Sequence, residues 1–313
     1  MQGTVTKSTG SWYQVKDTDG KMWNARTRGK LRLSDLDTSN PVAVGDQVKL
    51  KLDPNYTDTA TITDVLERKN YMIRRSNKLS SKRQILAANL DAAVLVASLI
   101  APKTSFGFID RFLVCAEMFH IPAAIFFNKM DLISEKLQDD IQNEILEVYQ
   151  NANVNIFFGS ANQNQNSSLN QLPNFVDFIY QKRILLAGHS GVGKSTLLNT
   201  LYPQANARVG KISDSHEKGK HTTTFAEMFH QIDGTQIIDT PGIRDFGVVD
   251  LKQQEVSEYF PEFRQFQQNC KFNNCTHIHE PGCAIIQAVE QEIIHPARYH
   301  SYLSIYHNED IFE

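Results

Sequence analysis

Apolar and polar residues alternate along the first 68 residues in the way that short β-strands require. Five such runs are separated by turns rich in glycine, aspartate and asparagine: GTVTKS, WYQVKD, MWNARTR, VGDQVKLKL and TATITDVLER. Five short strands in so small a space predict a closed barrel, and the strand count suits an OB-fold. An SH3-like barrel is the alternative, because counting strands does not separate the two.

From about residue 90 the pattern changes to continuous apolar runs that alternate with helical stretches such as 111–119 and 134–149. The runs cover residues 92–100, 122–128, 153–160, 182–190 and 235–242. Strands of this kind are buried on both faces, so they predict a parallel sheet between layers of helices. Ligands of such sheets bind at the carboxyl ends of the strands.

After about residue 245 the chain becomes acidic, aromatic and rich in histidine, and this change marks a third unit, which we expect to be α-rich. A chain of 313 residues is too long for one compact core. We therefore expect a barrel at 1–68, an α/β domain at 69–245 and an α-rich domain at 246–313. No run of about 18 apolar residues occurs, and the N-terminus lacks a signal-like apolar region, so we expect a cytoplasmic protein with no membrane partner.

The stretch GHSGVGKS follows a predicted strand, opens a predicted helix and fits the phosphate-loop pattern G-x-x-x-x-G-K-[ST]. Its glycines let backbone N–H groups converge on phosphate oxygens, while the lysine reaches the β- and γ-phosphates and the serine hydroxyl ligates Mg²⁺. The predicted phosphate-binding residues are Gly188, His189, Ser190, Gly191, Val192, Gly193, Lys194, Ser195 and Thr196.

The stretch NKMD at the end of another predicted strand has the composition of a guanine-selecting loop. The carboxylate of Asp131 can accept two hydrogen bonds, from N1–H and the exocyclic amine of guanine. Adenine lacks this donor pair, which argues against an ATP-dependent kinase. Asn128 would address the N7/O6 edge and Lys129 would lie over the ring, so the predicted base-binding residues are Asn128, Lys129, Met130 and Asp131.

Three further motifs complete a GTPase set. DTPG places Asp239 to hold Mg²⁺ through water and Gly242 to offer its N–H to the γ-phosphate, and GKHTTT supplies threonines for the metal and the γ-phosphate. GSAN places a backbone N–H of Ser160 and Ala161 near the base. The predicted magnesium ligands are Ser195, Thr223 and Asp239, and Thr224 is predicted to bind GTP with Thr223.

The motifs occur in the order base loop, Ser-Ala loop, phosphate loop, threonines, DxxG. Ordinary GTPases begin with the phosphate loop and end with the Ser-Ala loop, so the two orders are circular permutations of one another. The permutation also connects Gly242 directly to the C-terminal unit, which suggests that nucleotide state is passed on through the chain.

The catalytic group is less evident than the binding groups. Many GTPases orient the attacking water with a glutamine after DxxG, but Ile243 stands there and cannot do so. His221, beside the threonines, is the candidate for this catalytic role. The alternative is that His221 is only a solvent-exposed residue of that loop.

Three cysteines and a histidine near the C-terminus have the spacing C-x4-C-x-H-x5-C. Cys270, Cys275, His277 and Cys283 would form a closed tetrahedral Zn²⁺ site of the structural type. His279 competes with His277 for the fourth position. A disulfide with one free thiol, or buried unligated cysteines, are the alternatives.

Two basic stretches predict contact with RNA although the net charge is −3. Residues 21–32 and 68–83 contain no acidic side chain, and Trp23 and Tyr71 could offer stacking faces to bases. A solvated surface is the alternative for either stretch taken alone.

The barrel, the permuted motifs and the cysteine pattern together resemble the ribosome small-subunit-dependent GTPases, the RsgA family, over essentially the whole chain. AANLDAAVLVAS, GHSGVGKSTLLN, GKHTTT, DTPGIRDFG and RYHSYL add to the similarity. The resemblance implies a monomeric cytoplasmic GTPase that binds GTP and GDP, contacts 16S rRNA in the 30S subunit late in assembly, and is stimulated by that subunit. An RNA-binding scaffold that holds GTP without turnover is the alternative.

Overall fold

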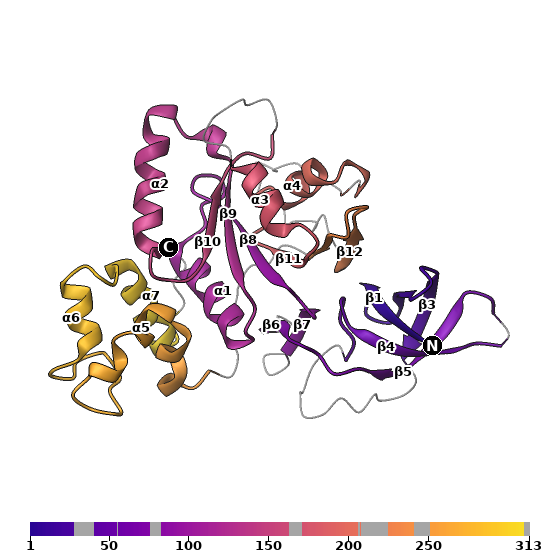
Figure 1. Cartoon of the computed structure of the whole chain (residues 1–313), viewed down its shortest axis with the longest axis horizontal. Coiled ribbons are helices and arrows are strands. Elements are labelled where there is room, and N and C mark those ends of the chain that lie inside the picture. The colour runs from indigo at the N-terminus through magenta and orange to yellow at the C-terminus, as the bar shows by residue number, and fades with distance from the viewer. Residues whose placement is uncertain are drawn as a thin grey trace.

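The computed structural model describes residues 1–27, 41–54, 56–75, 83–162, 171–205, 207, 225–240 and 251–309. Three parts follow one another in space: a β-barrel with the N-terminus, a central sheet covered by helices, and a helical part near the C-terminus (Figure 1). The predicted succession of barrel, α/β unit and α-rich unit is therefore confirmed.

The barrel is built from five strands: β1 (Gln2–Ser8), β2 (Tyr13–Asp17), β3 (Met22–Thr27), β4 (Gln47–Leu52) and β5 (Thr59–Val65). They pair in the order β1-β2-β3-β5-β4, and β4 returns to pair with β1. The pair β3–β5 is parallel and the other pairs are antiparallel. This Greek-key order is that of the OB-fold rather than of the SH3-like alternative.

The central sheet continues from five parallel strands to one antiparallel strand. Its order is β10 (Asn155–Phe158), β9 (Ala123–Asn128), β8 (Ala92–Ser98), β11 (Arg183–Ala187), β13 (Gln236–Asp239) and β12 (Glu227–His230). All seven residues of β8 are buried, as its unbroken apolar sequence predicted. Because these strands are parallel, the carboxyl ends of β9, β10, β11 and β13, and the loops that follow them, lie along one edge of the sheet.

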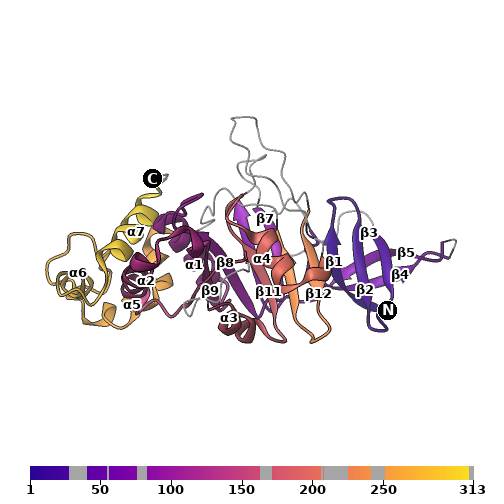
Figure 2. The same cartoon turned by 90° about the horizontal axis from the view of Figure 1, so that it is seen from above.

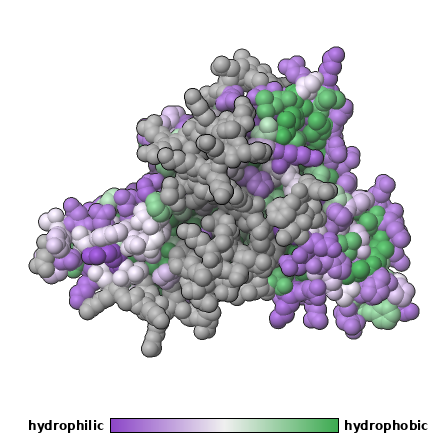
Figure 3. Space-filling model, turned by 180° about the vertical axis from the view of Figure 1, so that it is seen from behind, coloured by the Kyte–Doolittle hydropathy of each residue, from purple (hydrophilic) through white to green (hydrophobic). Residues whose placement is uncertain are grey.

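Side chains of successive strand residues pack into two separate cores, one on each face of the sheet. Leu95 of β8 packs under α1 (Phe106–Met118) and α2 (Glu135–Tyr149), whereas its neighbour Val96 packs under α3 (Leu172–Ile179) and α4 (Lys194–Leu201). This alternation follows from the two-residue period of a strand. On the back of the molecule, apolar side chains gather at the end that carries α2 (Figure 3).

The C-terminal part is made of short helices around its own core. They are η3 (Gln253–Tyr259), α5 (Pro261–Arg264), η4 (Gln267–Asn269), α6 (Ala284–Glu290) and α7 (Pro296–His307). This core includes Val114 of α1, and α7 lies against α1, so the C-terminal part is packed on the central sheet's helices (Figure 2). Two one-turn helices, η1 (Met130–Leu132) and η2 (Pro203–Ala205), lie elsewhere in the described part of the chain. Among the residues described, no helix is long and apolar enough to cross a membrane.

The barrel and the central sheet form one continuous sheet, because β1 pairs with β12 where Lys7 faces Glu227. The two side chains form an ion pair of 2.9 Å. A hairpin of β6 (Tyr71–Arg75) and β7 (Arg83–Ala88) links the two parts, and the Ala88 N–H donates to the carbonyl of Val44. The sequence reading treated this hairpin only as a basic stretch.

Candidate functional site

The phosphate loop lies between β11 and α4, and its backbone requires glycine at three positions. Gly188, Gly191 and Gly193 have φ angles of +144°, +87° and +98°. A Cβ on Gly188 would lie 2.3 Å from the carbonyl oxygen of Val96, and one on Gly193 would lie 2.3 Å from Nδ2 of Asn128. The loop is therefore folded tightly against the strands on which it stands.

The side chain of Lys194 is enclosed by this loop and hydrogen-bonded to its backbone. It is 7% exposed, and its Nζ donates to the carbonyl oxygens of Gly188 and His189, both at 2.8 Å. Burial lowers the pKa of Lys194 to about 8, and the nearby carboxylate of Asp239 opposes this shift. A phosphate group at this position would favour the charged amine, since a nearby opposite charge raises the pKa of a lysine.

The base loop is joined to the phosphate loop by two hydrogen bonds. Asn128 Nδ2 donates to the carbonyl of Val192 at 2.9 Å, and Lys129 Nζ donates to the carbonyl of Gly191 at 2.7 Å. Lys129 also donates to the carbonyl of Ala101 in the loop after β8. Motifs more than 60 residues apart in the chain thus meet at one edge of the sheet.

The Ser-Ala loop completes the same cluster. The amide of Ala161 donates to Asn128 Oδ1 at 2.9 Å, and the hydroxyl of Ser160 donates to the carboxylate of Asp131. The Asp131 amide donates in turn to Ser160 Oγ at 3.0 Å. Asp131 is thereby oriented by the loop that sequence reasoning credited only with a backbone contact. Met130 is 4% exposed and packs in the core, so its side chain serves the fold.

Of the remaining predicted residues of the nucleotide site, the structure describes some and leaves the others outside its described part. Asp239 ends β13, is 2% exposed and lies close enough to Lys194 to influence its pKa. Ser195 and Thr196 lie in the first turn of α4, directly after the phosphate loop. The other predicted residues lie outside the part of the chain that the structure describes: His221, Thr223, Thr224 and Gly242.

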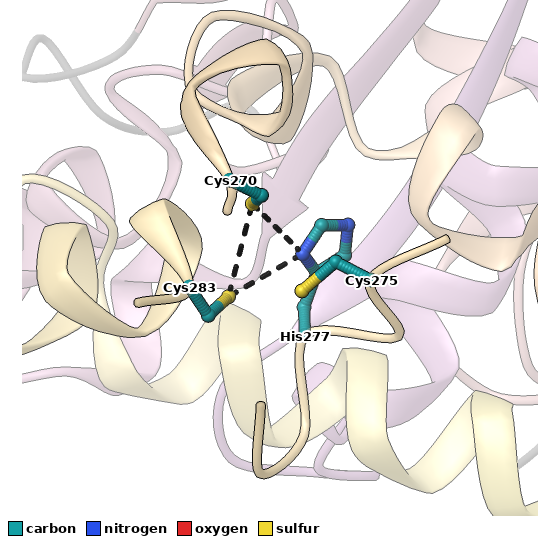
Figure 4. A group of neighbouring side chains, drawn as sticks. All are labelled: Cys270, Cys275, His277 and Cys283. Carbon is teal, nitrogen blue, oxygen red and sulfur yellow. Dashed lines mark hydrogen bonds between the residues drawn. The ribbon is translucent and has the colours of Figure 1, made fainter. Parts of the chain in front are cut away.

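The cysteine cluster gathers in the C-terminal part (Figure 4). Ligand atoms of Cys270, Cys275, His277 and Cys283 all lie within 4.8 Å of one another. His277 Nδ1 is 3.6 Å from the Cys270 sulfur and 3.4 Å from that of Cys283, and these two sulfurs are 4.0 Å apart. His279 is exposed and does not join the group.

These spacings fit a tetrahedral ion. Bonds of about 2.3 Å to sulfur and 2.0 Å to nitrogen would hold two sulfurs about 3.8 Å apart and a sulfur and a nitrogen about 3.5 Å apart. All four cysteines of the chain are free thiols in the structure, so the disulfide alternative is not observed. The cluster could hold a metal ion.

Glu280 organises the loop that carries His277. Its carboxylate accepts from the amide of Thr276 at 2.8 Å, from the Thr276 hydroxyl, and from the amides of Ile278 and His279. Burial raises the pKa of Glu280, but the hydrogen bonds of its carboxylate, with those from Thr276 the largest among them, together outweigh burial and lower this pKa. The loop needs such support because His277 has a left-handed φ of +59°.

The predicted stacking faces of the basic stretches need a correction. Trp23 is 7% exposed and its indole N–H donates to Asp17 at 2.7 Å, while Tyr71 packs against Phe119 with ring centroids 4.6 Å apart. The ring of Trp23 therefore serves packing, whereas Tyr71 is only partly buried and its predicted stacking on a base stays a prediction. Trp12, which the sequence reading passed over, is 40% exposed, and the guanidinium of Arg26 lies 4.4 Å from its ring centroid.

Comparison with known proteins places this arrangement among relatives. A family model described as RsgA GTPase matches residues 65–249, and one described as RsgA N-terminal domain matches residues 2–59. The "Small ribosomal subunit biogenesis GTPase RsgA" of Christiangramia forsetii is 44% identical over 315 residues, which cover 99% of this chain and 97% of that protein. The protein called RsgA 2 of Bacteroides thetaiotaomicron is 44% identical over 317 residues, with the same coverage.

Two solved structures are similar over almost the whole chain. YjeQ from Thermotoga maritima superposes with a TM-score of 0.75 at 30% identity, covering 98% of this chain and 97% of that one. YloQ, described as a circularly permuted GTPase, superposes with a TM-score of 0.70 at 29% identity, covering 98% and 94%. The permuted order of motifs thus has a counterpart in a known structure.

Proposed function

Since the chain belongs to the RsgA family of GTPases, we propose that it binds the small ribosomal subunit late in assembly and hydrolyses GTP to GDP and phosphate there. The observation that carries the nucleotide part is the pair of hydrogen bonds that join Asn128 and Lys129 to the phosphate loop. These bonds join the loop proposed to read the base to the loop proposed to bind the phosphates, which supports one shared nucleotide site. The names of the curated relatives support the subunit as partner.

Each group at this edge has a role that its chemistry supports. The Asp131 carboxylate accepts the two guanine donors, Lys129 covers the base, and Lys194 with the loop amides binds the phosphates. Ser195, Thr223 and Asp239 would hold Mg²⁺, which when bound neutralises charge on the β- and γ-phosphates. The predicted contacts of Thr224 and Gly242 with the γ-phosphate belong to the same proposal.

The cluster of three thiols and one imidazole is proposed to hold a structural Zn²⁺. Four protein ligands leave no position for a reacting water, so the ion would act on folding. The barrel is proposed to contact 16S rRNA, with Trp12 and Arg26 offering a stacking face beside a cation. A monomer in the cytoplasm fits a factor that acts on the subunit.

The subunit is expected to stimulate GTP hydrolysis by this protein by at least about tenfold, which corresponds to about 1.4 kcal/mol of transition-state stabilisation. Phosphate release is measured with and without purified 30S subunits, and with Lys194→Ala as the variant that lacks the phosphate-binding amine. Unchanged turnover in the presence of the subunit, together with tight GTP binding, would favour the RNA-binding scaffold instead.

His221 is proposed to orient the attacking water, because Ile243 cannot. His221→Ala is expected to lower subunit-stimulated turnover by about 100-fold, the lower range of general acid–base effects, with little change in GTP affinity. His230→Ala, at the far end of β12, serves as the matched control and keeps stimulated turnover. Full turnover of His221→Ala would leave His221 as an exposed residue of its loop.

Glu280→Ala is expected to weaken zinc binding by about 10- to 100-fold, as is typical when a group that orients the ligands is lost. The loop would lose the acceptor of four hydrogen bonds and with it the left-handed conformation of His277. Competition with a chromophoric chelator measures the affinity. The exposed Glu290→Ala variant is the control, and equal affinities of the two variants would contradict this role.

A further inference from the structure

Helix α1 contacts the phosphate loop through a pair of stacked rings. Phe108, in the first turn of α1, lies on the imidazole of His189 with ring centroids 3.8 Å apart and an angle of 29° between the planes. Phe108 is 7% exposed and belongs to the core between α1, α2 and the sheet. One side of the phosphate loop therefore rests on a buried ring.

The stacked residue is also one of the two whose carbonyl oxygens hold the phosphate-binding amine, Gly188 being the other. The carbonyl oxygen of His189 accepts from Lys194 Nζ at 2.8 Å. A change in the backbone at residue 189 would thus displace the amine that is proposed to bind the β- and γ-phosphates. The sequence motif leaves this position open, because only its backbone belongs to the phosphate-loop pattern.

Helix α1 is itself fixed from two sides. Its first turn is capped by Ser105, whose hydroxyl oxygen accepts from the Phe108 amide at 3.3 Å. Two adjacent buried residues of its second turn are held by the C-terminal part: Asp110 accepts from Arg298, and Arg111 donates to the carbonyl of Glu309. Phe108 is therefore a stationary support against which a glycine-rich loop can be held.

We propose that Phe108 is a positioning residue of the nucleotide reaction, which holds the phosphate loop in its binding geometry through His189. This inference rests on the proposed nucleotide site and adds a contact outside its known motifs. Without the ring, the loop spends part of its time in other conformations. The apparent dissociation constant rises by the inverse of the competent fraction.

Phe108→Ala and His189→Ala are each expected to raise the dissociation constant for fluorescent GDP by about tenfold, which would mean a competent fraction of about one tenth. The double variant is expected to bind no more weakly than the weaker single variant, because both changes break the same contact. His189→Phe keeps a ring in the stack and is expected to recover most of the affinity that His189→Ala loses. The KM for GTP rises with the dissociation constant, while kcat at saturating GTP is largely kept.

Phe112→Ala is the matched control. Phe112 lies one turn further along α1 and is fully buried in the same core. Its replacement by alanine removes the same side-chain volume as Phe108→Ala does. It is expected to lower the melting temperature while the dissociation constant stays within about twofold of the wild type, the usual limit for independent sites.

Nucleotide affinity in Phe108→Ala equal to that of the wild type, or equal to that of Phe112→Ala, would overturn the inference. Additive effects in the double variant would do the same. A wild-type protein that binds no GDP would instead contradict the proposed function. Should Phe108→Ala fail to fold, His189→Ala and His189→Phe carry the comparison, since His189 lies in a half-buried loop.

Discussion

Replacing Asp131 with asparagine is expected to weaken GTP binding by about 100-fold or more and to create affinity for xanthine nucleotides. The carboxylate accepts two guanine donors in the proposed complex, and hydrogen bonds to a charged group contribute about 1.5–3 kcal/mol each. The amide of asparagine turns one acceptor into a donor that faces the guanine amine. Xanthine carries an oxygen at that position, so the new donor finds a partner.

Ser160 makes this prediction specific to the base. Its hydroxyl donates to one carboxylate oxygen of Asp131, and an asparagine oxygen can still accept that bond. The loop should therefore keep its shape while its preference changes. Binding of fluorescent GDP and xanthosine diphosphate is measured for the variant and for Asp139→Asn, an exposed carboxylate of α2. Equal loss of both nucleotides in Asp131→Asn would point to a collapsed loop and against base reading by this residue.

Replacing Arg298 with methionine is expected to lower the free energy of unfolding of the C-terminal part by about 3–5 kcal/mol, the usual cost of breaking a buried ion pair. Arg298 is 2% exposed, donates to Glu262 at 2.7 Å and donates to Asp110, and both carboxylates are buried. Methionine fills much of the volume but leaves two buried carboxylates without a cation. Urea unfolding followed by the fluorescence of the tyrosines measures the loss.

Arg264→Met provides a matched control. Arg264 also joins the C-terminal part to α1, through Glu117, but its side chain is 47% exposed. Exposed pairs contribute about 0–1 kcal/mol, so this variant should unfold nearly as the wild type does. Adding Asp110→Asn and Glu262→Gln to Arg298→Met should recover part of the loss, since the uncompensated charges are then removed. A loss that the two amides do not reduce would mean that packing, and not charge, explains it.

The pH dependence of Arg298→Met follows from the same charges. Burial raises the pKa of Asp110 in the folded protein, and Arg298 is the main group that opposes this shift. Without Arg298 the folded pKa rises further above its unfolded value. The protonated, neutral form of Asp110 is then favoured by folding. The stability that this form contributes is fully present below the unfolded pKa of Asp110 and is lost as pH rises through its folded pKa. The variant is therefore expected to be closer to the wild type at acidic pH than at neutral pH.

The nucleotide site could be predicted from sequence because its groups belong to compact motifs. Gly188, Gly193 and Lys194 have fixed spacing since the backbone of one loop must enclose phosphates, and NKMD reads one edge of a base. The contacts between motifs were not predictable in the same way. Lys129 donates to a carbonyl of Ala101, and any residue offers a carbonyl, so no side chain marks that position.

The fold shows the same division between local pattern and distant contact. The apolar sequence of β8 predicted its place between two helical layers. The strand β12 was missed because four residues give too short a period, and the hairpin β6–β7 was missed because its cations suggested an RNA-binding surface. Asp110 and Arg298 are 188 residues apart, so only the three-dimensional structure reveals their pairing.

The pairing of β1 with β12 gives the barrel a structural role in addition to its proposed contact with rRNA. An unpaired edge strand offers its free N–H and C=O groups to other chains, and this is a common route to aggregation. Here the edge strand is β12, which is only four residues long. The barrel strand β1 pairs with it where Lys7 lies opposite Glu227. The N-terminal barrel thereby shields the adjoining sheet from self-association, and a chain deprived of it would expose that edge strand to neighbours.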